Sequence, residues 1–117
     1  MKRILLVVFS VFLLVAFAFG APSDRQRKVI AKKLYGRILV VDVPGQEDYR
    51  ILPVNVRGQE DLRVLVVNVR GQEKSVGRWL FVDIPGQEDY RVLFVDVRGQ
   101  EDLRVLFVDV HGQEGVR

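Results

Sequence analysis

The sequence predicts an all-β protein, an antiparallel β-meander of six short strands built from 13-residue tandem repeats. First, Gly-Gln-Glu recurs six times in the 117 residues, at spacings of 13, 13, 15, 13 and 13. Second, a seven-residue segment rich in β-branched and aromatic residues lies just ahead of each tripeptide. Third, residues 36–76 and 77–117 are identical at 29 of 41 positions, which indicates two duplicated three-strand blocks.

The composition excludes most enzyme chemistries. The chain has 18 Lys and Arg residues against 15 Asp and Glu residues, no Cys and one His. A disulfide framework, a Cys-His metal cluster and a thiol nucleophile are therefore excluded. We expect no enzyme activity, no catalytic residue, no cofactor and no bound metal.

Residues 1–20 have the pattern of a secretory signal peptide. Lys2 and Arg3 precede an apolar run over residues 4–19, and small residues, Ala18 and Gly20, occupy the positions that a signal peptidase reads. Sixteen residues of helix span roughly 24 Å, which is less than the hydrocarbon thickness of a membrane. We therefore predict cleavage after Gly20 and a secreted, extracellular protein.

A short basic helix is predicted over residues 21–36. Ser23, followed three residues later by Gln26, forms a capping box, and Gly36 lies where a helix would stop. A small positive cluster of this kind is attracted to anionic surfaces, but no aromatic residues alternate with its charges, so we expect no nucleic-acid partner. The cluster consists of Arg25, Arg27, Lys28, Lys32 and Lys33.

The repeat domain covers residues 37–117. Its predicted strands are Arg37–Val43, Arg50–Val56, Arg63–Val69, Arg78–Ile84, Arg91–Val97 and Arg104–Val110. Pro53 cannot donate a ladder hydrogen bond, so the second strand is expected to be bulged or weakly paired there. A β-solenoid and a largely disordered chain are the alternative interpretations of the same repeats.

Charge favours antiparallel pairing. A parallel solenoid with equivalent residues in register would stack Arg on Arg, which is unfavourable. Hairpins closed by Gly-Gln-Glu instead place an acid or amide opposite each Arg. The predicted pairs are Asp42 with Arg50, Asn55 with Arg63, Asp83 with Arg91, and Asp96 with Arg104.

Apolar residues point to both faces of each predicted strand, so neither face is suited to water. Large exposed apolar patches indicate a partner or aggregation, and open strand edges invite another copy. We therefore expect a non-enzymatic secreted protein that works by self-association or as an extracellular structural or interaction protein. Its predicted contact residues are Phe81, Phe94 and Phe107, which replace Val40, Pro53 and Val66 of the first block.

A precursor of short secreted peptides is the alternative function. Release of small copies at basic residues would explain the repetition without any fold. The candidate processing positions are Gly20, Lys32, Lys33, Arg37 and Arg78.

Overall fold

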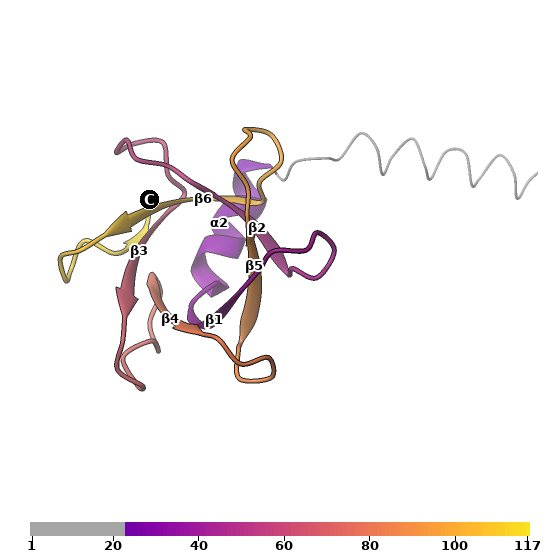
Figure 1. Ribbon diagram of the computed structural model, residues 1–117. Coiled ribbons are helices and arrows are strands. Elements are labelled where there is room, and N and C mark those ends of the chain that lie inside the picture. Colours follow the sequence, from indigo (N-terminus) through magenta and orange to yellow (C-terminus); the bar gives the residue numbers. More distant parts are fainter. Residues whose placement is uncertain (1–22) are drawn as a thin grey trace, which may run out of the picture.

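The computed structural model describes residues 23–117, which form one helix and seven strands (Figure 1). The elements are α2 (Asp24–Lys33), β1 (Gly36–Val41), β2 (Tyr49–Pro53), β3 (Leu62–Val67), β4 (Arg78–Val82), β5 (Tyr90–Phe94), β6 (Leu103–Val108) and β7 (Gly115–Val116). All six predicted strand regions are present, and each ends two or three residues earlier than predicted. The predicted signal peptide lies outside the described residues.

The six long strands form a closed, all-parallel barrel. Their order is β4-β1-β5-β2-β6-β3, and β3 pairs again with β4. Only the two-residue β7 is antiparallel, at the edge of β3. The predicted antiparallel meander is therefore wrong, and so is the alternative of a solenoid, because consecutive strands within a block are not neighbours.

The strands of the two duplicated blocks alternate around the barrel. The first block contributes β1, β2 and β3, which occupy every second position, and the second block fills the gaps with β4, β5 and β6. From β1 to β6 the chain therefore passes about one and a half times around the barrel. At each step it skips one strand position, except at residues 74–77, where it moves to the adjacent one. A move of two positions there would place β4 on the position of β1. The 15-residue spacing between the blocks therefore coincides with the shorter move that lets the strands of the two blocks interleave.

A stagger between neighbouring strands removes the charge conflict expected for parallel pairing. Gly36 pairs with Trp79, which lies two residues beyond its sequence counterpart Gly77, and Arg37 pairs with Leu80. Equivalent residues are therefore never directly opposite in this pair, and Arg does not stack on Arg. Barrel closure requires such a stagger of its strands. The predicted Asp-Arg hairpin pairs do not form, since their strands are separated by a strand of the other block.

Six tight turns end the strands, and glycine is required in each. In the turn at residues 43–46, the Gln46 amide donates to the Val43 carbonyl at 3.3 Å, and Gly45 has φ +100°. Proline at the second position and a positive φ at the third describe a type II turn. The equivalent bond and a glycine with positive φ recur in the other five turns. The Gly-Gln-Glu signature thus marks a backbone conformation that L-residues with a side chain rarely adopt.

The glutamate of each turn bonds to the glycine amide of the same turn. In three turns it also pairs with the arginine that opens the next strand. The Gly86 amide and Arg91 Nε both donate to Glu88, each at 2.7 Å. Arg91, the Glu88 amide and the Gly86 amide lower the pKa of Glu88 to about 2. The other two such pairs are Glu47 with Arg50 and Glu101 with Arg104.

In four turns the residue after the glutamate is an aspartate whose side chain accepts a backbone hydrogen bond from a strand of the other block. Asp89 Oδ2 accepts the Arg37 amide at 2.9 Å, and Asp48 Oδ2 accepts the Arg91 amide at 2.8 Å. Each bond joins the turn before one strand to the start of a neighbouring strand from the other block. The same bond links Asp102 to Arg50 and Asp61 to Arg104.

Helix α2 covers the end of the barrel where the strands begin, inside the outline of the ring in Figure 1. Ala31 and Leu34 are fully buried against the first inward-facing residues of β3 and β6. Trp79 Nε1 donates to the Leu34 carbonyl at 2.8 Å, which fixes the end of the helix to β4. The predicted capping box is confirmed, since Gln26 and Ser23 exchange hydrogen bonds. The helix is shorter than predicted and ends at Lys33, so Gly36 belongs to β1.

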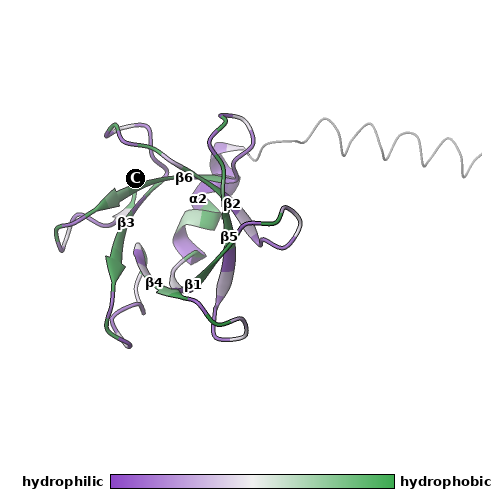
Figure 2. Ribbon diagram, viewed as in Figure 1, coloured by the Kyte–Doolittle hydropathy of each residue, from purple (hydrophilic) through white to green (hydrophobic). Residues whose placement is uncertain are grey.

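Both faces of the strands are buried, which explains why both are apolar (Figure 2). The inward residues at the middle of the barrel form a fully buried layer that contains Ile38, Ile51, Val64, Trp79, Val92 and Val105. Outward leucines such as Leu65 and Leu80 pack with Val67 in a second cluster. Val108 of β6 packs against this second cluster, so the outer side of the wall also has buried apolar contacts.

Candidate functional site

The barrel is open at the end where the strands finish, and this mouth is lined by apolar side chains. Residues two apart in a strand share a face. The six residues that lie two positions beyond the buried middle layer therefore also face inward, but α2 is at the opposite end and does not cover them. They are Val40, Pro53, Val66, Phe81, Phe94 and Phe107, named here the apolar mouth.

Solvent reaches most of the apolar mouth. Val40 and Val66 are 44% and 46% exposed, and Phe81 and Phe107 are each 37% exposed. Pro53 is exposed and Phe94 is half-buried. The middle layer directly beneath is fully buried, so the exposed fraction changes sharply between inward-facing residues two positions apart in a strand.

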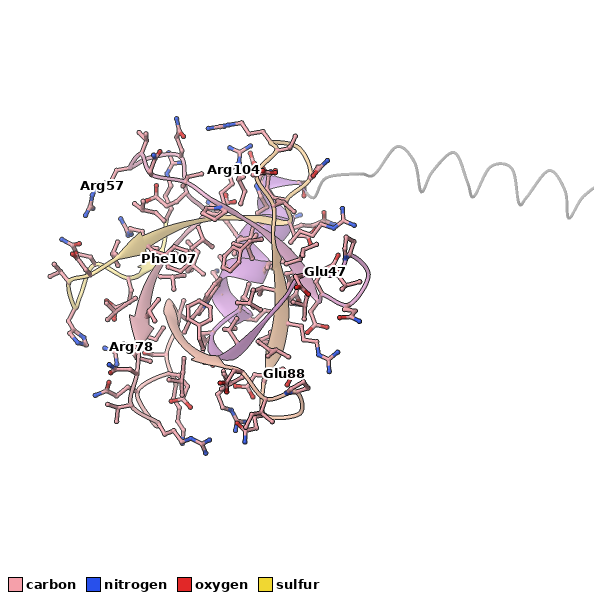
Figure 3. All side chains as sticks on the ribbon, in the orientation of Figure 1. Glu47, Arg57, Arg78, Glu88, Arg104 and Phe107 are labelled. Carbon is pink, nitrogen blue, oxygen red and sulfur yellow. The ribbon has the colours of Figure 1, made fainter. Side chains whose placement is uncertain are left out.

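Ring contacts confirm that the phenylalanines point into the barrel. Phe94 and Phe107 belong to β5 and β6, which are separated by β2, yet their ring centroids are 6.3 Å apart. Trp79 lies beneath them, with its ring 5.9 Å from Phe107 and 6.1 Å from Phe81, both edge to face. Strands in a sheet are about 4.8 Å apart, so rings on second-neighbour strands meet only across a concave face. Figure 3 places Phe107 within the ring of strands.

Large and small side chains alternate around the apolar mouth. In the order β4-β1-β5-β2-β6-β3, the residues are Phe81, Val40, Phe94, Pro53, Phe107 and Val66. The alternation follows from two facts: the second block carries Phe where the first block carries a smaller residue, and the two blocks interleave. The surface therefore has three raised positions and three low ones.

Polar and apolar residues surround the apolar mouth. Two residues beyond each mouth residue is an exposed acid or amide: Asp42, Asn55, Asn68, Asp83, Asp96 and Asp109. The next residue of each repeat is an exposed Val or Ile in the turn, half-covered in every case. The mouth therefore has an apolar centre and a rim with four carboxylates.

The sequence singled out Phe81, Phe94 and Phe107, and the structure brings all three together in the apolar mouth. The sequence did not indicate that Val40, Pro53 and Val66 complete the ring, or that Trp79 lies beneath it. The 13-residue period alone contained this signal, because all six residues occupy the same repeat position. Joining these six residues in one ring also requires the parallel strand order, which the sequence did not predict.

The basic cluster of the predicted helix is divided by the structure. Arg27 pairs with Asp24 and with Asp61 of the turn before β3, so it holds the helix to the barrel. Arg25, Lys28, Lys32 and Lys33 are exposed. Lys33 Nζ lies 5.6 Å from the centre of the Tyr49 ring, and a hydrogen bond that the Lys33 ammonium donates to the Tyr49 side chain raises the pKa of Lys33.

The processing positions lie in different settings. Gly20 is outside the described residues, whereas Lys32 and Lys33 are accessible in the last turn of α2. Arg37 pairs with Asp89 at 3.1 Å and Arg78 pairs with Glu114 at 2.9 Å, both in strands of the barrel. Within residues 23–117 no group of acidic or histidine side chains is arranged to hold a metal ion.

No helix in the described part of the chain is long and apolar enough to span a membrane. Residues 31–117 match the family described as the 7(1) septoil knot domain. No curated protein and no solved structure shows significant similarity to the chain.

Proposed function

The chain belongs to the 7(1) septoil knot domain family, and we propose that it is a secreted, non-enzymatic protein that works by associating with further copies of itself through the apolar mouth. The described fold suits such a role because a closed barrel has no free strand edge among its six long strands. Uncontrolled edge pairing is thereby avoided, and attraction between copies is confined to one end.

The alternation of Phe81, Phe94 and Phe107 with smaller residues carries this proposal. When two copies face each other mouth to mouth, a rotation by one strand position sets each Phe of one copy over a small residue of the other. Such a surface is self-complementary, which is what a two-fold interface between identical copies requires. Full burial of a Phe side chain contributes roughly 1.5–3 kcal/mol, and less for these rings, which are already partly covered.

The apolar mouth is also prearranged. Trp79 is fully buried and holds Phe81 and Phe107 edge to face from below. Rings that are fixed before contact lose little conformational freedom when a second copy covers them. Aromatic side chains of this kind often dominate the energetics of protein interfaces.

The test is sedimentation velocity of residues 21–117 across micromolar concentrations. We expect a reversible dimer, and we expect the triple variant Phe81→Ser, Phe94→Ser and Phe107→Ser to be monomeric. A control, Val29→Ser, changes an apolar side chain that is 56% exposed on α2, at the opposite end of the barrel. The control should dimerise as the parent chain does. A monomeric parent chain, or a dimer lost equally in the control, would overturn the proposal.

A reciprocal variant sharpens the result. Val40→Phe and Val66→Phe fill two low positions of the apolar mouth while adding apolar surface. If the fit between raised and low positions drives association, this variant dimerises more weakly despite being more apolar. Stronger dimerisation would show that the contact is non-specific.

The precursor alternative is tested on the same secreted material. Cleavage at Arg37 or Arg78 would cut paired strands of the barrel, whereas the proposed function requires an intact chain. Mass spectrometry should find one product beginning near residue 21. A set of peptides of about 13 residues, the repeat length, would favour the precursor function.

A further inference from the structure

A basic cleft lies at the opposite end of the barrel from the apolar mouth. It is bounded by the last turn of α2, the start of β1 and the turn that precedes β4, and it has a volume of about 1020 Å³. Five cationic side chains line it: Lys32, Lys33, Arg37, Arg70 and Lys74. Two acids, Glu73 and Asp89, and two tyrosines, Tyr35 and Tyr90, complete the lining.

A break in the repeat adds to the positive charge of this cleft. At four equivalent positions an aspartate follows Gly-Gln-Glu and accepts a strand amide, as Asp89 does from Arg37. Lys74 occupies that position where the two blocks join. The substitution reverses the charge in the turn that lies beside Lys32 and Lys33 of α2.

Three of the cations make no ion pair with the described residues, although the charge of Lys74 acts on Glu73. Arg37 is paired with Asp89, and Lys33 lies against Tyr49, whereas Lys32, Arg70 and Lys74 make no ion pair within residues 23–117. Arginines at the same repeat position in other turns differ, since Arg57 and Arg98 donate to glutamine side chains.

The acids of the cleft do not cancel this charge. Glu73 is only 8% exposed, and its Oε1 accepts the Gly71 amide at 2.6 Å. Its own amide, the Gly71 amide and the charges of Lys74 and Arg37 lower the pKa of Glu73 against the effect of burial, so this one carboxylate offsets only part of the positive charge of the cleft. Asp89 holds the backbone and side chain of Arg37.

We propose that this cleft binds a segment of a sulfated polysaccharide. Several separated cations favour a ligand with several anionic groups, and an open cleft favours a chain that continues past both ends. Tyr35 and Tyr90, half-buried against the core, add apolar surface to the lining of the cleft. This inference is independent of self-association, because the cleft and the apolar mouth share no residue.

The experiment is isothermal titration calorimetry of residues 21–117 with a heparin hexasaccharide and with its desulfated form. We expect binding of the sulfated form only, weakening as salt increases. Arg70→Glu and Lys74→Asp should each weaken binding about tenfold, the effect of roughly one lost charge-assisted contact. Lys74→Asp also restores the repeat residue, so the barrel is expected to keep its fold.

Arg98→Glu is the matched control, because it makes the same change of charge at the same repeat position in another turn. It should leave binding within about twofold. If Arg98→Glu weakened binding as much as Arg70→Glu does, the cleft would be overturned as the site. The same conclusion would follow if only Arg25→Gln, at an exposed position of α2, weakened binding. An oligonucleotide of equal charge that bound as tightly as the hexasaccharide would overturn the choice of ligand. Circular dichroism of each variant separates loss of binding from loss of fold.

Discussion

The two ends of the barrel are built from the same repeated strand but meet solvent differently. At the end where the strands begin, the inward Leu62 and Leu103 are fully buried in one cluster with Ala31 and Leu34, and Trp79 anchors the helix through the Leu34 carbonyl. At the other end, the inward residues of the same strands are left open as the apolar mouth. The difference teaches that a helix outside the repeats closes the opening where the parallel strands begin and leaves the opening where they finish uncovered.

The largest expected effect is on the layer that both ends share. Trp79→Ala should destabilise the barrel by about 3–5 kcal/mol, because it removes a fully buried aromatic side chain and leaves the Leu34 carbonyl without its donor. Phe107→Ala, at the open end, should cost clearly less because its ring is 37% exposed. Urea unfolding monitored by circular dichroism measures both. Similar losses of unfolding free energy in the two variants would mean that the Phe107 ring is covered in solution.

Acid should weaken the turns of the two blocks together. The pKa of Glu88 is about 2 in the folded protein, below the ordinary value of 4.5, and those of Glu47, Glu101 and Glu114 are also lowered. A lowered folded pKa means that the stabilisation is complete above about pH 4.5 and is lost as pH falls towards 2. Denaturation midpoints at several pH values test this. A midpoint that stayed constant from pH 6 to pH 2 would contradict it.

A single glutamate variant isolates one turn from the others. Glu101→Gln removes the charge of a side chain that is only 3% exposed and accepts from Gly99 and Arg104. We expect a loss of about 1.5–3 kcal/mol near neutral pH. The variant should also depend less on pH below 4.5 than the parent chain. Asp42→Asn, an exposed rim position, serves as the control and should change stability little.

The smallest expected effect touches only the closed end. Ser23→Ala removes the N-cap of α2 and should cost about 1 kcal/mol. Hydrogen exchange should show faster opening of α2 and unchanged protection in the turns at the mouth. If amide exchange also became faster in the strand ends around the mouth, the two ends would be more strongly coupled than their separate contacts indicate.

The sequence predicted local features well because they depend on neighbours in the chain. The capping box of Ser23 and Gln26 needs residues three apart, and each Gly-Gln-Glu marks a turn of four residues. The direction of pairing was wrong because the charge argument assumed equivalent residues side by side. In the barrel, Gly36 lies beside Trp79, so the like charges that would have opposed parallel pairing are never aligned.

By itself, the sequence determined where strands, turns and the helix cap occur, and which residues differ between the two blocks, because turn geometry and capping are set within a few residues. Only the tertiary structure decided that the blocks interleave, that the strands run parallel, and that Phe81, Phe94 and Phe107 meet at one opening. Those outcomes depend on closing six staggered strands into a ring. Closure is a property of all the strands at once, and no single repeat contains it.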